Sequence, residues 1–176
     1  MASCFPPGFR FKSAGRRSVF AAAIVSVLAL ANCAPPPPPP TPPTIAYVQI
    51  NTTSDVNGMP GAPGAPIALR VYQLASSDAF TGAEFYPLYN SDKVTLGADL
   101  LKKDEMVLKP SDTKLMNLTP SDQVKTIAVF GAYAAFGTVI WRVSADMPAH
   151  QTTTFTITAS SAGLKLVATP GKPAVP

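Results

Sequence analysis

Side chains that usually carry chemistry are scarce in this sequence. Its 176 residues include two cysteines, one tryptophan and one histidine, His150, which lies in an expected surface turn. Zinc sites need three or four cysteine, histidine or carboxylate ligands, so this composition gives no basis for one. Gly-x-Ser-x-Gly, P-loop and dinucleotide-binding glycine patterns are also missing. We therefore expect no cofactor, no metal and no catalytic residues, and hence no enzyme.

Carboxylates offer one further acid-base motif. Asp104 and Glu105 are adjacent and Asp99 lies nearby, as a carboxylate pair or a calcium site would require. Neighbouring strand residues point to opposite faces, however, and two lysines, Lys102 and Lys103, lie alongside. A solvated charged edge is the preferred interpretation.

No hydrophobic run reaches the length of a membrane span. Residues 18–30 are apolar, but about 13 residues are too few to cross a bilayer, which takes roughly 20. They follow four basic residues, which is typical of an export signal. An uncleaved anchor or a buried helix is the alternative. Arg16 and Arg17 loosely resemble a twin-arginine signal, but ordinary Sec export is favoured.

The apolar run ends in Leu30, Ala31, Asn32 and Cys33, which resemble the lipobox where bacterial lipoprotein precursors are acylated and cut. This resemblance makes 1–32 the signal peptide and Cys33 the lipidated residue, carrying covalent lipid such as palmitate. The mature chain would have 176 − 32 = 144 residues, enough for one domain. Ala34, rather than Asp, follows the cysteine, which by the usual sorting pattern favours the outer membrane.

Loss of the signal changes the charge and thiol content. Four of the 14 basic residues and none of the 10 acidic residues lie in 1–32, so 14 − 4 = 10 basic residues balance 10 acidic ones. A balanced protein gives no electrostatic case for nucleic acid or an anionic surface as partner. Cys4 leaves with the signal and Cys33 takes the lipid, so no thiol remains for a disulfide or a metal.

A proline tract follows the lipidated cysteine. Residues 34–43 hold eight of the twenty prolines, which predicts polyproline II and a stalk of roughly 30 Å. Residues 33–43 are therefore interpreted as a lipidated stalk that holds the domain away from the lipid. A proline-rich ligand for a partner's groove is the alternative.

From residue 45 on, short apolar and alternating runs between turn residues are typical of β structure. Residues 126–134 are almost wholly apolar, as in a central strand, and 152–158 predict a strand with one wet face. We expect a sandwich of two antiparallel sheets over 44–169 and a disordered tail over 170–176. The expected strands are 45–53, 67–75, 105–109, 114–118, 126–134, 139–145, 153–159 and 163–169.

Alternation is imperfect in the second expected strand. Leu69 and Val71 share one face and Arg70 the other, but Tyr72 and Leu74 blur the pattern.

A small helical insert is expected over about 76–101. Ser76 or Ser77 can cap its first helix, and Pro87 indicates a break. A further short turn can start at Asp92 and end near Gly97. An apolar face is expected from Phe80, Phe85, Leu88 and Tyr89.

The loop between the first two strands is unusually long and contains three glycine- and proline-rich triplets in the collagen register. Three triplets cannot form a triple helix, so a stiff solvated loop and a recognition loop are the two interpretations. Its candidate binding residues are Asn57, Gly58, Met59, Pro60, Gly61, Ala62, Pro63, Gly64, Ala65 and Pro66.

Seven motifs follow one another in a specific order. They are Leu69-Arg70-Val71-Tyr72-Gln73-Leu74, Asp78-Ala79-Phe80, Phe85-Tyr86-Pro87-Leu88-Tyr89, Leu96-Gly97-Ala98-Asp99-Leu100-Leu101, Asp104-Glu105-Met106-Val107-Leu108-Lys109-Pro110, Ala132-Tyr133 and Trp141-Arg142. Together with the lipobox they resemble the type VI secretion system outer-membrane lipoprotein family, TssJ, over roughly 45–166.

This resemblance implies a transthyretin-like sandwich with a helical addition, anchored at the inner leaflet of the outer membrane with its domain in the periplasm. It implies binding to the periplasmic C-terminal region of a TssM-like inner-membrane protein, within a complex that also contains a TssL-like protein. In the family the loop between the first two strands contacts that partner, which places the contact at 57–66.

A periplasmic ligand- or glycan-binding lipoprotein is the alternative from another class. Tyr86, Tyr89 and Trp141 are its possible stacking residues. A single tryptophan in a strand is more often part of a core, with Arg142 then on the outer face.

Overall fold

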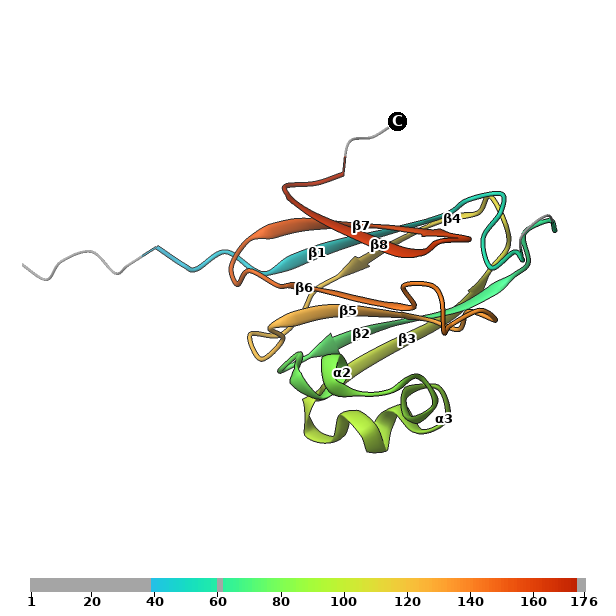
Figure 1. The fold of residues 1–176 in the computed structure, drawn as a ribbon. Coiled ribbons are helices and arrows are strands. Elements are labelled where there is room, and N and C mark those ends of the chain that lie inside the picture. The colour runs from blue at the N-terminus through green and yellow to red at the C-terminus, as the bar shows by residue number, and fades with distance from the viewer. Residues whose placement is uncertain (1–38, 60–61, 174–176) are drawn as a thin grey trace, which may run out of the picture. The chain divides into compact units, whose positions relative to one another are not determined.

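The computed structural model describes residues 39–59 and 62–173, and its strands form two four-stranded sheets (Figure 1). The strands are β1 (Ile45–Thr52), β2 (Ile67–Leu74), β3 (Leu100–Leu108), β4 (Thr113–Leu118), β5 (Thr126–Gly131), β6 (Arg142–Asp146), β7 (Thr152–Ser160) and β8 (Gly163–Pro170). The first sheet has the order β4-β1-β7-β8 and the second β3-β2-β5-β6. The predicted sandwich is confirmed, but β1 and β7 run parallel, so the first sheet is mixed rather than purely antiparallel.

The two sheets bury one apolar core between them. Every second residue of β1 points inward, and Ala46, Val48 and Ile50 are fully buried. Phe155 and Ile157 from β7 are equally buried in the same cluster. This period of two is what a half-buried strand requires, because successive side chains point to opposite faces.

Strand β2 has two apolar faces, which explains its imperfect alternation. Leu69 and Val71 lie in the core between the sheets, whereas Tyr72 and Leu74 lie in a second core on the other side of β2. Every residue of β5 is buried for the same reason. A sheet covered on both faces loses its polar face, so apolar runs replace alternation.

Helices α2 (Asp78–Gly82) and α3 (Phe85–Leu96) and the 3₁₀ turn η2 (Gly97–Asp99) form the predicted helical insert. They cover the outer face of the second sheet (Figure 1). Pro87 does not break α3, because it lies in the first turn, where its missing N–H costs no helical hydrogen bond. The break lies at Ser91, whose φ of −146° and ψ of 46° are not helical, as the predicted new turn at Asp92 requires.

Three predicted strand boundaries were wrong. β3 begins at Leu100 rather than at 105. The charged residues from Lys102 onward argue against a central strand, but β3 lies at the edge of its sheet, where charges are tolerated. β5 ends at Gly131 and β6 begins only at Arg142, so residues 132–141 form a loop. An isolated bridge from Ile140 to Gly163 is the only strand-like pairing in that loop.

The predicted signal peptide, with Cys33, and the first part of the stalk lie outside the described residues, as do 174–176. Residues 39–43 of the stalk are exposed. Within 39–59 and 62–173, no helix has the length and hydropathy needed to cross a membrane.

Candidate functional site

The connection between β1 and β2, which contains the predicted binding residues, is attached to the sandwich by its base. Val56 is fully buried, and its carbonyl accepts a hydrogen bond from the N–H of Ala65 at 2.9 Å. Pro60 and Gly61 lie outside the described residues. Met59, next to them, is 58% exposed, so the loop is fixed at its base and offers an apolar side chain to solvent.

Glycine in this loop reflects the close approach of its two limbs. A Cβ atom on Gly64 would lie 2.4 Å from the carbonyl oxygen of Ser54 on the opposite limb, a distance that no side chain allows. The prolines between the glycines restrict the backbone further. The two described limbs of the loop therefore lie close together.

Two polar residues fix the loop to its neighbours. The Asn57 side chain donates to the carbonyl of Pro66 at 3.2 Å and accepts from the N–H of Ala134 at 2.8 Å. Asp55 accepts hydrogen bonds from the hydroxyls of Ser161 and Thr53, and these bonds hold the pKa of Asp55 below its ordinary value of 3.8. Asp55 is therefore ionised at neutral pH and holds the loop against the β7–β8 turn.

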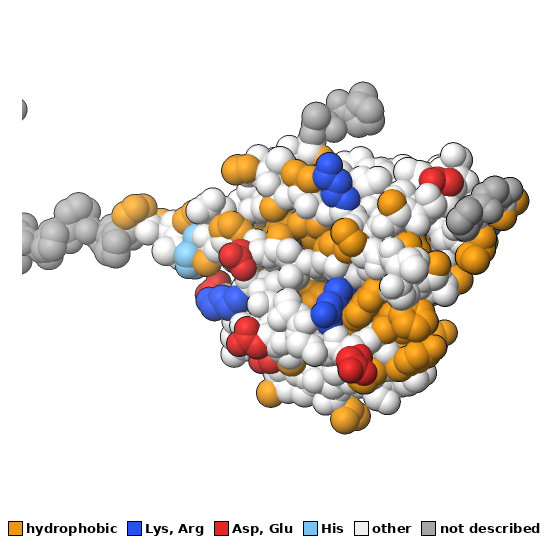
Figure 2. Space-filling model, in the orientation of Figure 1, with side chains coloured by type: hydrophobic (Ala, Val, Ile, Leu, Met, Phe, Trp, Pro, Cys, Tyr) orange, Lys and Arg blue, Asp and Glu red, His pale blue; other side chains and the backbone are white. Residues whose placement is uncertain are grey.

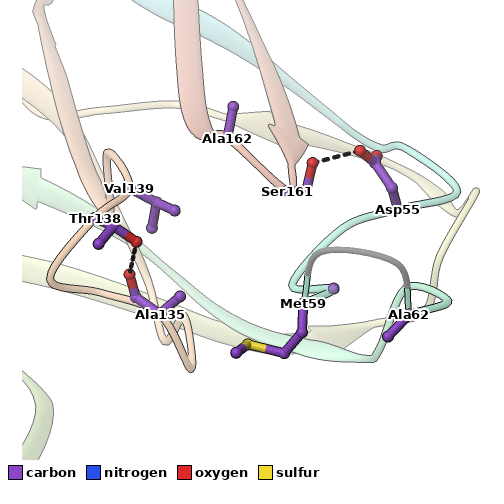
Figure 3. A pocket seen from close by; sticks show the side chains of 9 residues that line it. Asp55, Met59, Ala62, Ala135, Thr138, Val139, Ser161 and Ala162 are labelled. Atoms are coloured by element: carbon purple, nitrogen blue, oxygen red, sulfur yellow. Dashed lines mark hydrogen bonds between the residues drawn. The ribbon is translucent and has the colours of Figure 1, made fainter.

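A hollow of about 330 Å³ lies between the β1–β2 loop, the 132–141 loop and the β7–β8 turn (Figure 3). Met59 extends from the loop toward Ala135. Asp55 is the only titratable side chain among the described residues that line the hollow. Its described lining therefore offers no second acid-base group beside Asp55.

Beside the loop, six aromatic side chains form one cluster, which we call the aromatic patch. The Phe85 ring stacks on Phe136 with centroids 4.1 Å apart, and Tyr86 meets Phe136 edge-on at 5.2 Å. Tyr86 and Tyr89 remain 59% and 45% exposed. Figure 2 shows hydrophobic side chains gathered over this end of the molecule. The members are Phe85, Tyr86, Tyr89, Phe130, Phe136 and Trp141.

Arg142 lies on the outer face of the second sheet, as predicted, but the helical insert covers this face. Its guanidinium donates to the carbonyls of Phe80 and Ala83 and lies 4.6 Å from the centroid of the Trp141 ring. Trp141 is half-buried and packs edge-on against Phe85. A ring covered in this way leaves little face for a sugar, which weakens the glycan alternative at Trp141.

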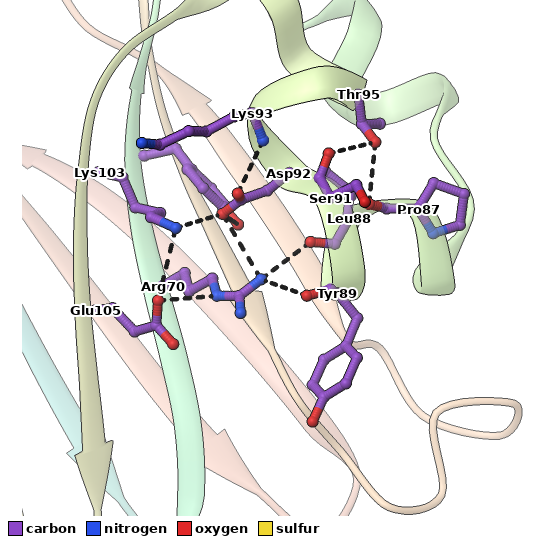
Figure 4. A network of polar contacts seen from close by, with 11 residues as sticks. Arg70, Pro87, Leu88, Tyr89, Ser91, Asp92, Lys93, Thr95, Lys103 and Glu105 are labelled. Atoms are coloured by element: carbon purple, nitrogen blue, oxygen red, sulfur yellow. Dashed lines mark hydrogen bonds and ion pairs between the residues drawn. The ribbon is translucent and has the colours of Figure 1, made fainter.

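A network of charged groups joins the helical insert to the second sheet (Figure 4). The buried Asp92 carboxylate accepts from Lys103 at 2.8 Å and from the Tyr72 hydroxyl at 3.1 Å. Arg70 donates to the carbonyls of Leu88 and Tyr89, at 3.0 and 2.9 Å, which lie just before the helix break at Ser91. The network therefore holds the end of α3 that carries the two exposed tyrosines.

The expected charged edge is only partly solvated. Glu105 joins the network through Arg70 at 3.3 Å and Lys103 at 3.6 Å, whereas Asp104 belongs to the opposite face. His150 lies in an exposed turn, as predicted. Among the described residues, no group of three or more His, Cys, Asp or Glu side chains is placed to hold a metal ion.

Sequence reasoning missed the contribution of the 132–141 loop. Phe136 was assigned no role, and the contact between Asn57 and Ala134 spans 77 residues. Neither has a local signal, because Phe136 lies in an alanine-rich connection without periodicity. Only the pairing of β2 with β5 brings the two loops to one end of the sandwich.

The fold and this end surface define a class: a small β-sandwich with a helical addition and an exposed, largely apolar loop end. The model of one protein family, described as "Type VI secretion lipoprotein, VasD, EvfM, TssJ, VC_A0113", matches residues 44–162. The chain belongs to this family, as its motifs predicted. A comparison with curated proteins gave no match.

Solved structures agree with this assignment. The type VI lipoprotein TssJ1 from Pseudomonas aeruginosa is 28% identical over 74% of this chain and 100% of its own, with a TM-score of 0.70. Lip from Serratia marcescens, a membrane-bound component of the type VI secretion system, is 28% identical over 71% and 98%, with a TM-score of 0.65. A chain of a structure described as "Type VI membrane complex" shares the fold at 19% identity over 70% and 98%, with a TM-score of 0.60.

Proposed function

We propose that this protein is the outer-membrane lipoprotein of a type VI secretion membrane complex, and that it binds the periplasmic C-terminal region of a TssM-like inner-membrane protein. Its role is then to tether and assemble the trans-envelope complex, which also contains a TssL-like protein, without catalysis. Family membership supports the setting. One solved structure with the same fold is described as "T6SS protein TssM C-terminal domain (869-1107) from EAEC".

The anchor in this proposal is a lipid on Cys33, with the protein at the inner leaflet of the outer membrane. One acyl chain binds a membrane only marginally, so the several chains of a lipoprotein cysteine give firm attachment. The polypeptide enters the sandwich at Ile45, and the eight residues of β1 separate that point from the β1–β2 loop by roughly 25 Å. The loop end therefore lies opposite the attachment point and is available to a partner that spans the periplasm.

The single observation that carries the binding role is the stiff, apolar loop end. A loop that is already compact loses little conformational freedom when it binds, so more of the contact energy remains as affinity. Met59 gives this end an exposed apolar side chain beside the hollow. The binding residues in this proposal are those of the 57–66 loop.

Binding can be tested by calorimetric titration of residues 44–176 with the periplasmic region of a TssM-like protein from the same genome. Removing residues 58–66 should raise the Kd at least tenfold, because that segment would carry central contacts. Near-ultraviolet circular dichroism checks that the shortened protein is folded. Equal affinity with and without the loop would move the site elsewhere, and absence of binding would favour the glycan-binding alternative.

Replacing Cys33 by serine should release the protein from the membrane fraction into the soluble periplasmic fraction. The thiol is the acylation point, and no other lipid attachment is proposed. The described sandwich begins at Ile45, so thermal unfolding of the domain should not change. Immunoblotting of fractions from cells that express Cys33→Ser or Cys4→Ser, the matched control, measures the effect. Membrane retention of Cys33→Ser would contradict the lipid anchor.

A further inference from the structure

Tyr86 and Tyr89 are the most exposed rings of the aromatic patch, at 59% and 45%. Both stand on the buried Phe85, whose ring stacks on Tyr89 at 5.8 Å and meets Tyr86 edge-on at 5.6 Å. Among the hydrogen bonds of the described residues, none uses either tyrosine hydroxyl. Two large rings held on a packed base are already ordered before any partner arrives.

The aromatic patch is continuous with the β1–β2 loop. A second hollow of about 260 Å³ is shared by Asn57 of that loop, Tyr86 and Tyr89 of α3, and Phe136 of the 132–141 loop. Asn57 is also the residue whose side chain bonds to Ala134 at the rim of the patch. Loop and patch therefore form one surface at one end of the sandwich.

Charged residues near this surface lie outside the second hollow; Glu84 and Arg142 line the neighbouring hollow beside Tyr86 and Phe136. Every described residue that lines the second hollow is uncharged: Asn57, Phe85, Tyr86, Tyr89, Ala132, Tyr133, Ala134 and Phe136. Two guanidiniums lie against rings of the patch, Arg142 at 4.6 Å from the centroid of Trp141 and Arg70 at 5.8 Å from that of Tyr89. Both are already engaged, because Arg142 donates to the carbonyls of Phe80 and Ala83 and Arg70 to those of Leu88 and Tyr89. A charged occupant would lose its hydration here without gaining an opposite charge.

We propose that the TssM-like partner covers the aromatic patch as well as the loop, with Tyr86 and Tyr89 as anchors for an apolar, uncharged segment of its periplasmic region. This inference rests on the proposed function and extends the site from the loop to α3. Exposed tyrosines fit the anchor role because they bury a large area while losing only two side-chain torsions, and such residues dominate binding energy.

The test is calorimetric titration of the full mature chain, purified in detergent, with the partner's periplasmic C-terminal region. Tyr86→Ala and Tyr89→Ala should each raise the Kd at least tenfold, whereas Tyr86→Phe keeps the ring and should stay within twofold of wild type. Val94→Ala is the matched control, because Val94 lies on the same helix, is 84% exposed and is outside the patch. Raising sodium chloride from 50 to 500 mM shortens the electrostatic screening length on the order of threefold. For an uncharged contact, this should change the Kd less than threefold.

The outcomes separate this inference from the proposed function. If wild type binds and both alanine variants bind with the Kd of wild type, the patch is not part of the interface. If Tyr86→Phe is as weak as Tyr86→Ala, the hydroxyl rather than the apolar ring makes the contact, which overturns an apolar occupant. A steep loss of affinity as the salt concentration rises would also overturn an apolar, uncharged occupant. If wild type does not bind, the proposed function itself fails.

Discussion

Replacing Asp92 by alanine should lower the free energy of unfolding by about 3 kcal/mol, because a buried ion pair is costly to break from one side. The carboxylate is the shared acceptor of Lys103 and Tyr72, and Arg70 lies 3.6 Å away. Its removal leaves these groups partly buried without their acceptor. The helical insert should loosen first, since Asp92 lies just after the break at Ser91. Urea unfolding followed by circular dichroism measures the change.

Asp99→Ala is the matched control, because Asp99 is a partly exposed acid in the same insert, outside the salt bridges of Asp92. It should change stability by less than about 0.5 kcal/mol. Equal losses for both variants would contradict a special role for Asp92. Partner binding should weaken in Asp92→Ala only, because α3 carries Tyr86 and Tyr89.

Acid titration gives a second readout of the same carboxylate. Burial alone would raise the pKa of Asp92, but the hydrogen bonds from Lys103 and Tyr72 and the nearby positive charges bring it below its ordinary value of 3.8. A carboxyl whose pKa is lowered by folding stabilises the folded state above its ordinary pKa, and that stability is lost as pH falls through the folded pKa. Wild type should therefore lose stability from about pH 4 downward. Asp92→Ala should lose less over the same range.

Replacing Gly163 by alanine should lower the free energy of unfolding by about 2 to 5 kcal/mol, through backbone strain and overpacking together. Its φ of 114° is a conformation that L residues rarely adopt. A Cβ atom would also lie 2.4 Å from the carbonyl oxygen of Ile140. That carbonyl accepts a hydrogen bond from Leu164 at 2.6 Å, so relief of the clash would move the 132–141 loop away from the β7–β8 turn. Thermal unfolding by calorimetry measures the loss.

Gly137→Ala is the control for this substitution. Gly137 lies in the same loop, has no positive φ, and a Cβ atom there meets no heavy atom within 4 Å among its described surroundings. Alanine should be neutral there or stabilise slightly, by about 0.5 kcal/mol, because it restricts the unfolded chain. Similar unfolding temperatures for Gly163→Ala and wild type would contradict the close approach of the two turns.

Local pattern sufficed for most of the sandwich because strand formation follows alternation and turn residues. The limits of β1 (Ile45–Thr52) lie within one residue of the prediction. Prediction failed where the position of a residue within a sheet or helix, rather than the sequence around it, decides which side chain is tolerated. β3 (Leu100–Leu108) carries charges that its edge position makes acceptable, and Pro87 lies in a helical turn that needs no N–H from it. Arg142 lies on the outer face as predicted, but no local pattern shows that the helical insert covers it there.

The sequence by itself determined the expected export and anchoring plan, the sandwich, the helical insert and the family, because each depends on composition, period or ordered motifs along the chain. Tertiary structure decided which residues share a surface. Asn57 and Ala134, or Phe85 and Phe136, meet only when strands far apart in sequence pair in register, since contacts between remote segments leave no periodic trace in either segment. The aromatic patch beside the β1–β2 loop is a product of that pairing.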